Sequence, residues 1–506
     1  MVCSHSRLAD TRLLGSKVAY LFSLCVVVIG LATTAKRAVA DLLIYSPPGT
    51  DMTVQLMGNV DVNVGGTISY RHPRGTLHFS AQDCKIVRTT STKKLYANER
   101  LEAKRGGTAD AYLKLALWCV EHALIKQADE AIKEAWKVDP DNRRVKLMLA
   151  LTRYRRGTVP SSPNIEEEIR AFVKNEDMKV ARSRHFILLH DTPENDDPIL
   201  KMPVSRYRLQ LLEKVYDSFY MKYALEGYPL KVPREPMRVV LFNNHGDYLN
   251  FVRLLDPSLK MASGFYSPKE NIAIYYQQRS DHAFAGLSET SKMLSQSRES
   301  LKRAQLRGEV SGAGEFIRFA KTLELIMDII VEDEEIEVVT HEATHQLAAN
   351  SDLLSRERFQ VRWAHEGLAS YFEAPKDATW SGIGAVNETR LGYYRILALD
   401  PERSSIEYVV TDRIFDEAGD HFSQLAAYGQ AWALTHFLME KHLDKLIEFY
   451  RKMAVDDFET TRDEVWQAKV LKTFKQCFGD LEKLDLEWRS YMQGLRTDAE
   501  KLAAQP

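Results

Sequence analysis

Cysteine is scarce in this chain of 506 residues, and its five cysteines are widely spaced. They are Cys3, Cys25, Cys84, Cys119 and Cys477. Because no Cys-x-x-Cys pair occurs, the sequence does not have the pattern of a disulfide scaffold. The stability of the protein is therefore expected to come from packing.

The chain also lacks a P-loop, a dinucleotide-binding glycine fingerprint and a Gly-x-Ser-x-Gly nucleophile elbow. It has no excess of positive charge, since its net charge is −2 and its pI is near 6.7. Nucleic acid is therefore not expected as a partner. A hydrophobic content of 45% and a charged content of 27% are ordinary for a globular protein.

A His-Glu-x-x-His motif at residues 341–345 is the most informative stretch. Apolar residues around it recur at spacings of three and four, which predicts a helix with one buried face. On such a helix His341 and His345 lie one above the other, so both imidazoles can bind one zinc ion. Glu342 is then placed to take a proton from a water on the metal. The competing interpretation is a buried helix with two incidental histidines.

A second stretch at 363–373 can supply the third ligand. The interval after His345 is long enough to end one helix, cross a loop and start another. Glu366 would then be the anionic ligand, and Gly367 would allow the second helix to approach closely. His365 competes with Glu366, but adjacent helical positions point about 100° apart, so only one of them is expected to face the metal.

The two motifs together resemble those of the gluzincin, or peptidase-MA-like, zinc metallopeptidases, in which a His-Glu-x-x-His helix is followed by a helix carrying Glu-Gly-x-Ala. The resemblance is strong over about 337–373 and looser over about 180–450. The chain also resembles a bacterial domain-of-unknown-function family of that superfamily, whose members pair this domain with short helical repeats. The resemblance implies a zinc ion on His341, His345 and Glu366, with Glu342 as general base.

The resemblance also implies roles for residues farther along the chain. Tyr428 lies where gluzincins carry a Tyr or His that donates a hydrogen bond to the oxyanion, although an aromatic packing residue is an equal alternative. His421 and His436 are weaker candidates. Some relatives carry an acid one turn after the third ligand, but Ser370 stands there. Glu373 is either its substitute or, as the favoured interpretation, a solvated charge.

The first 40 residues have the pattern of a secretory signal. Basic residues precede an uncharged, mostly apolar run at 18–35, and Ala38 and Ala40 form a small-x-small cleavage site. An uncleaved membrane anchor through 18–35 is the alternative. Either interpretation predicts an exported protein that is periplasmic, extracellular or anchored to the envelope.

Composition and periodicity predict a multidomain α+β protein. Its expected segments are a signal peptide or anchor at 1–40, a small β module at 41–100, a tetratricopeptide-like helical segment at 101–157, a linker at 158–178, a gluzincin-like metallopeptidase domain at 179–495 and a polar tail at 496–506. The large domain is expected to begin with a mixed sheet and to continue as mainly helical structure, including the zincin helix pair.

Three details within the large domain stay open at this stage. The strand at 272–276 could be an edge against which a peptide lies in extended form, or an ordinary internal strand. The very polar stretch at 287–307 is either a solvated helix or an insertion. The acids at 332–335 are expected to lie at the N-terminus of the zinc helix, where they would suit its dipole.

These observations favour an exported zinc metallopeptidase that acts on a peptide or protein substrate. The same site would also suit hydrolysis of a non-peptide amide or ester. The alternative from another class is an envelope-associated interaction protein with a structural or inactive zinc domain. No signature of an acidic pocket for a substrate ammonium is visible, and nothing in the sequence indicates an oligomeric state.

Overall fold

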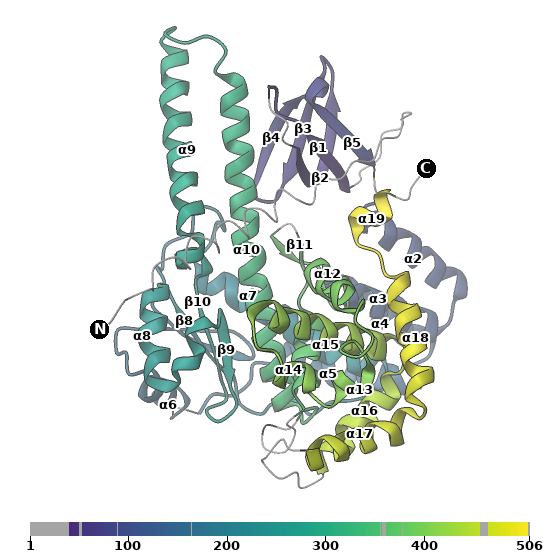
Figure 1. Cartoon of the computed structure of the whole chain (residues 1–506). Helices are drawn as coiled ribbons and strands as arrows, with labels where there is room; N and C mark the ends of the chain where they lie inside the picture. Colours follow the sequence, from purple (N-terminus) through teal and green to yellow (C-terminus); the bar gives the residue numbers. More distant parts are fainter. Residues whose placement is uncertain are drawn as a thin grey trace. The chain divides into compact units, whose positions relative to one another are not determined.

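The computed structural model describes residues 40–49, 53–88, 90–162, 164–354, 356, 361–376, 378–455 and 464–503. The predicted signal or anchor lies outside these residues, apart from its last position. None of the helices described is both long and apolar enough to cross a membrane. Helices and strands are mixed along the chain (Figure 1), which confirms the α+β prediction. The described cysteines Cys84, Cys119 and Cys477 are free.

The chain divides into two compact units. Unit 1 comprises residues 1–95, 281–328 and 498–506, and unit 2 comprises residues 96–280 and 329–497. Helices α2 (Thr92–Gly106) and α10 (Gly314–Asn350) each contribute residues to both units.

Unit 1 contains an antiparallel sheet with the strand order β4-β3-β2-β1-β5. Its strands are β1 (Ala40–Tyr45), β2 (Val54–Asn63), β3 (Thr67–His72), β4 (Gly75–Ser80) and β5 (Cys84–Arg88), with the short helix η1 (Ala81–Asp83) before β5. The residue patterns at 54–56 and 60–64 suggest separate strands, but β2 is one strand that begins at the first pattern and ends at Asn63 within the second. Its pairing with β1 on one side and β3 on the other keeps this strand continuous.

Unit 1 also contains α9 (His282–Leu306), the first part of α10 and α19 (Asp498–Ala503). Figure 1 shows α9 and α10 as two long helices joined by a turn. An ion pair of 2.9 Å between Arg298 and Glu324 links them. The polar stretch at 287–307 is thus mostly a solvated helix, as one of the two interpretations predicted.

Unit 2 begins with the helices α3 (Ala109–Glu121), α4 (Ile125–Val138), α5 (Arg143–Arg156) and α6 (Asn164–Val173). Within the segment predicted to be tetratricopeptide-like, the side chains of Ala116, Cys119, Ala128 and Ala135 are fully buried. The stretch at 158–178, predicted as a linker, contains α6. This helix forms because Ile165, Ile169 and Val173 recur on one face and are buried with the sheet of unit 2.

The sheet of unit 2 has the strand order β6-β7-β8-β10-β9. Its strands are β6 (Lys179–Arg182), β7 (Phe186–His190), β8 (Met237–Phe242), β9 (Gly264–Ser267) and β10 (Ile272–Tyr276). Strands β7, β8 and β10 are parallel to one another, whereas β6 and β9 are antiparallel edges. Of the two interpretations of 272–276, the edge strand is wrong and the ordinary internal strand is confirmed, because β10 is paired on both sides.

Both faces of this sheet are covered, which explains its continuous apolar strands. Helices α6 and α8 (His245–Leu255) pack on one face, where Ile187 and Leu189 point. Phe186 and Leu188 point to the other face, toward the cluster that contains α7 (Val204–Leu225) and the second part of α10. The helix that carries the His-Glu-x-x-His motif is therefore fixed against the sheet. Two short helices, η2 (Pro257–Met261) and η3 (Gln278–Ser280), complete this part.

The acids at 332–335 lie inside α10, so the prediction that they cap the N-terminus of a separate zinc helix is wrong. The helix runs through them because their charges are neutralised from neighbouring elements. Arg208 of α7, which is 4% exposed, forms ion pairs with Glu332 and Glu335. Asp333 accepts a hydrogen bond of 2.8 Å from the Ala378 backbone N–H.

The remainder of unit 2 is mainly helical. It consists of α11 (Arg362–Phe372), β11 (Pro375–Lys376), β12 (Thr379–Trp380), α12 (Glu388–Leu397), α13 (Ile406–Val410), α14 (Arg413–Asp416), α15 (His421–Lys441), α16 (Leu443–Val455), α17 (Glu464–Phe478) and α18 (Leu481–Gly494). Gly367 permits the close approach of α11 to α15, since a Cβ there would lie 2.5 Å from the carbonyl oxygen of Ala431.

Candidate metal centre

Three donor side chains converge where α10 meets α11. The Nε2 atoms of His341 and His345, one helical turn apart on α10, lie 3.1 Å from each other. The Oε2 atom of Glu366, on the first turns of α11, lies 3.2 Å from Nε2 of His341 and 3.7 Å from Nε2 of His345. Among the described residues, this is the only group of three or more potential metal ligands that converge in this way.

The size of this triangle fits a zinc ion. Tetrahedral zinc with bonds of about 2.0–2.1 Å places its ligand atoms roughly 3.3 Å apart. Two imidazoles and one carboxylate are a donor set of catalytic zinc sites, which leave one position for water or substrate. The three side chains are 12%, 14% and 17% exposed, so solvent reaches the centre.

The structure brings Glu366, rather than His365, to the two histidines. The ring centroid of His365 lies 6.2 Å from that of His345, and His365 does not belong to the converging group. The single-residue offset along α11 turns the two side chains in different directions.

Glu373 lies behind His341, on the side away from the converging atoms. It is 1% exposed, and its Oε1 atom lies 2.5 Å from Nδ1 of His341. The favoured interpretation of Glu373 as a solvated charge is therefore wrong, and the alternative as the acid that orients a ligand histidine agrees with the geometry. Ser370, at the position where some relatives carry that acid, also contacts Glu373 at 3.3 Å.

Two residues of α12 and the loop before it hold Glu373 in place. Arg390 donates hydrogen bonds of 3.0 Å to both carboxylate oxygens, and Asn387 donates one of 3.1 Å. Arg390 also donates to Glu337, one turn before His341, at 3.1 Å. The Asn387-Glu388-Thr389 stretch matches a glycosylation sequon, but the Asn387 side chain is buried and bonded here.

The charges at the centre shift several pKa values. Burial acts to raise the pKa of Glu373, but the charges and hydrogen bonds of Arg390 and His341 outweigh it and lower that pKa to about 2. Burial likewise acts to lower the pKa of His341, but its contacts with Glu366 and Glu373 raise that pKa well above its ordinary value. Burial acts to raise the pKa of Glu366, but the hydrogen bonds and charges of His341 and His345 hold that pKa well below its ordinary value.

Glu342 interacts both with the candidate metal ligands and with strand β9. Burial raises its pKa above the ordinary value, although the two histidines and a hydrogen bond from the Tyr266 backbone N–H act in the opposite direction. Strand β9 lies directly against α10, because a Cβ at Gly264 would be 2.7 Å from Cγ1 of Val338. The edge strand of the sheet thus borders the general-base candidate.

Tyr428 of α15 lies on another side of the centre. Its ring centroid is 6.4 Å from that of His341, and the guanidinium of Arg390 lies 5.2 Å from its ring centre. The negative charge of Glu366 and burial raise the pKa of Tyr428, so its hydroxyl stays protonated and able to donate.

The two weaker histidine candidates lie outside the converging group. His421 is exposed at the start of α15. His436 is buried and is hydrogen-bonded to the Gly384 carbonyl and the Tyr491 hydroxyl, which indicates a packing role.

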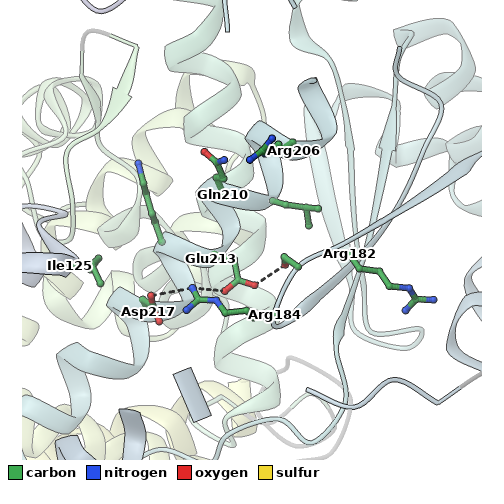
Figure 2. A pocket seen from close by; sticks show the side chains of 10 residues that line it. Ile125, Arg182, Arg184, Arg206, Gln210, Glu213 and Asp217 are labelled. Atoms are coloured by element: carbon green, nitrogen blue, oxygen red, sulfur yellow. Dashed lines mark hydrogen bonds and ion pairs between the residues drawn. The ribbon is translucent and has the colours of Figure 1, made fainter. Parts of the chain in front are cut away.

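A separate pocket lies beside α7 and is lined by none of these residues. Figure 2 shows Glu213 and Asp217 of α7 turned toward Arg184, which follows β6. Arg184 contacts Glu213 at 3.1 Å and Asp217 at 3.5 Å. Asp217 also pairs with the buried Arg155 at 2.9 Å. Because its acids are matched by arginines, this pocket has the character of a structural ion network.

Arg390 and Asn387 were not foreseen from the sequence. No motif marks them, since their contacts with Glu373 and Glu337 depend on how α12 packs beside α10 and α11. The capping preference of Asn387 for α12 was the only local signal, and it says nothing about the metal centre.

A family model described as "Protein of unknown function (DUF1570)" matches residues 335–457, which is less than half of the chain. The matched segment contains His341, Glu342, His345, Glu366, Glu373, Arg390 and Tyr428. No curated protein and no solved structure matched the chain. The chain is thus similar, over the segment that carries the candidate metal centre, to a family whose description states no activity.

Proposed function

We propose that this protein is a zinc-dependent metallopeptidase of the gluzincin type. The observation that carries the proposal is the convergence of three donor atoms, on His341, His345 and Glu366, at mutual distances of 3.1–3.7 Å. Glu342 is adjacent in sequence to the first ligand, as hydrolysis by this class requires.

A bound zinc ion would lower the pKa of a water molecule and polarise a substrate carbonyl. The side chains around it then have distinct tasks. The Glu342 carboxylate accepts a proton from the attacking water and delivers it to the leaving amine nitrogen. The raised pKa of Glu342 suits both steps, because a general base works best when its pKa is near the operating pH.

Glu373 has a positioning role. A carboxylate that accepts from Nδ1 of His341 keeps the proton on that nitrogen and leaves Nε2 free to bind metal. Arg390 holds this carboxylate through both oxygens, so the imidazole is fixed from behind. The Tyr428 hydroxyl would donate a hydrogen bond to the oxyanion that forms at the scissile carbonyl.

Strand β9 is the element that we propose aligns a peptide. It is an edge of its sheet, it lies against α10, and its Tyr266 N–H contacts Glu342. An extended peptide added to such an edge would gain main-chain hydrogen bonds with little sequence selectivity. We also propose that the protein is exported, on the signal-like pattern of residues 1–40.

The test compares the wild-type protein with a Glu342→Gln variant, after purification without added metal. Zinc content and cleavage of an unbiased peptide library are measured on both proteins. We expect both to hold zinc and only the wild type to cleave, with a loss of about 10²–10⁴ in rate for the variant. Cleavage that survives unchanged in the variant would remove Glu342 from the mechanism. Zinc binding without cleavage by either protein would favour the interaction-protein alternative.

A further inference from the structure

Arg362, the first residue of α11, has its backbone held in place by Asp412, which lies between α13 and α14. Its N–H donates a hydrogen bond of 2.6 Å to Oδ2 of Asp412, and the Trp363 N–H donates one of 2.7 Å to Oδ1. Both oxygens of one carboxylate thus cap the start of α11. The same helix presents Glu366 one turn later, so Arg362 and Glu366 lie on one helix face.

The side chain of Arg362 is also ordered by packing. Its guanidinium carbon lies 4.5 Å from the ring centre of Phe415. Phe415 in turn meets Tyr428 edge to face, with ring centroids 5.5 Å apart and an interplanar angle of 88°. A guanidinium stacked on an aromatic face keeps its in-plane N–H donors available for a planar acceptor.

Arg362 differs in its ion pairs from Arg390, the other arginine near the candidate centre. Arg390 pairs with both Glu373 and Glu337. None of the ion pairs among the described residues includes Arg362, which is partly exposed. Its charge nevertheless acts on Tyr428, which lies beside the metal ligands. A pre-ordered cation therefore stands next to the proposed catalytic centre with donors to spare.

We propose that Arg362 binds a carboxylate of the peptide substrate and thereby determines specificity. This inference rests on the proposed function. The planar, two-pronged donor geometry of arginine matches a carboxylate, which peptides offer in two places. One is the C-terminal carboxylate, and the other is an Asp or Glu side chain.

The test is a binding measurement in which hydrolysis is blocked. Zinc-loaded Glu342→Gln protein is titrated calorimetrically with four N-acetylated peptides of one sequence. The four peptides are the combinations of a free or an amidated C-terminus with a Glu or a Gln at one chosen position. The set of four is repeated with that Glu or Gln at several positions of the sequence. We expect peptides with the recognised carboxylate to bind about 10- to 100-fold more tightly, as for a hydrogen bond between charged groups.

The same titrations are repeated on a double variant, Glu342→Gln with Arg362→Gln. We expect the double variant to lose that difference in affinity and to bind the peptide with Gln and an amidated C-terminus as before. Arg362→Lys should restore part of the preference, since lysine keeps the charge but not the planar fork. Arg413→Gln is the matched control, because Arg413 already pairs with Glu417 at 2.8 Å and stacks on Tyr408. It should leave the preference intact.

The four peptides distinguish a C-terminal carboxylate from an acidic side chain as the group that Arg362 binds. The titrations also distinguish failure of this inference from failure of the proposed peptidase function. A preference for a free C-terminus would identify a C-terminal exopeptidase subsite, and a preference for internal Glu would identify a subsite for acidic residues. Equal affinities for all four peptides, absence of binding, or a preference that persists in Arg362→Gln would overturn the inference. Failure of the proposed function would instead appear as loss of the difference in cleavage between wild type and Glu342→Gln.

Discussion

Two histidines of unit 2, His185 and His341, share one contact and differ in another. The Nδ1 atoms of both His185 and His341 face a glutamate, at 2.7 Å from Glu213 and 2.5 Å from Glu373. The Nε2 atom of His185 contacts the Tyr154 carbonyl oxygen at 2.9 Å, so both of its ring nitrogens are engaged. The Nε2 atom of His341 instead faces a second imidazole and a carboxylate.

This difference separates a structural histidine from a candidate metal ligand. The Tyr154 carbonyl oxygen accepts a hydrogen bond from Nε2 of His185. The nearby acids are paired with arginines, Asp217 with Arg155 and Glu213 with Arg184. At the candidate centre, the ion-pair partners of Glu366 among the described residues are the imidazoles of His341 and His345. An acid and two nitrogen lone pairs directed at one point are satisfied best by a cation.

The largest difference between the two histidines is expected when each is replaced by alanine. His341→Ala is expected to lose the zinc ion and with it all measurable hydrolysis. Catalytic zinc is normally held by three protein ligands, and only two would remain. His185→Ala should keep zinc in full and lose only stability, by about 3–5 kcal/mol for a disrupted buried charge network. Zinc content and thermal unfolding of the two variants check this prediction. A His341→Ala protein that retains its zinc would contradict it.

Tyr428→Phe should reduce kcat by about 10²–10³ with little change in zinc content. The cause is loss of one hydrogen-bond donor to the oxyanion while the ring and its packing remain. Steady-state kinetics on a cleaved peptide measure the effect, and Tyr394→Phe, at a buried tyrosine of α12, is a suitable control. If Tyr428→Phe leaves kcat unchanged, Tyr428 is a packing residue, which was the competing prediction from the sequence.

Glu373→Gln should weaken zinc binding by about 10- to 100-fold, since the acid that orients His341 and raises its basicity is removed. Glu213→Gln makes the same change behind His185 and should leave zinc affinity unchanged. Competition with a chelator gives both affinities. Equal effects of the two substitutions would show that Glu373 does not act on the metal through His341.

Zinc affinity should depend on pH. Without metal, the contacts with Glu366 and Glu373 hold the pKa of His341 above its ordinary value, so this histidine carries a proton that zinc must displace. Affinity is therefore fully expressed only above that pKa and should fall by about tenfold for each pH unit below it. Chelator competition between about pH 6 and 8 measures the slope. A flat profile would indicate that no proton is released.

The sequence was most informative where chemistry depends on neighbours along one helix. His341, Glu342 and His345 could be predicted as a group because helical spacing alone places them together. Glu366 could be proposed because the second motif follows at a suitable interval and resembles that of a known superfamily. The mixed sheet and its apolar strands were likewise visible in local patterns.

Features that depend on distant parts of the chain were not predictable. Glu373 looked like a solvated charge because Arg390, which neutralises it, comes from α12. The acids at 332–335 looked like a helix start because Arg208, which pairs with Glu332, comes from α7. The edge position of β9 follows from the order of strands in the sheet, and no periodicity within 264–276 encodes that order.

The central claim is that His341, His345 and Glu366 hold one zinc ion. Anomalous diffraction at the zinc absorption edge, from crystals of protein purified without added metal, tests it most directly. The prediction is a single strong peak at bonding distance, about 2.0–2.2 Å, from Nε2 of both histidines and from a Glu366 carboxylate oxygen. A peak at other residues, or none at this position while zinc is present in solution, would contradict the claim.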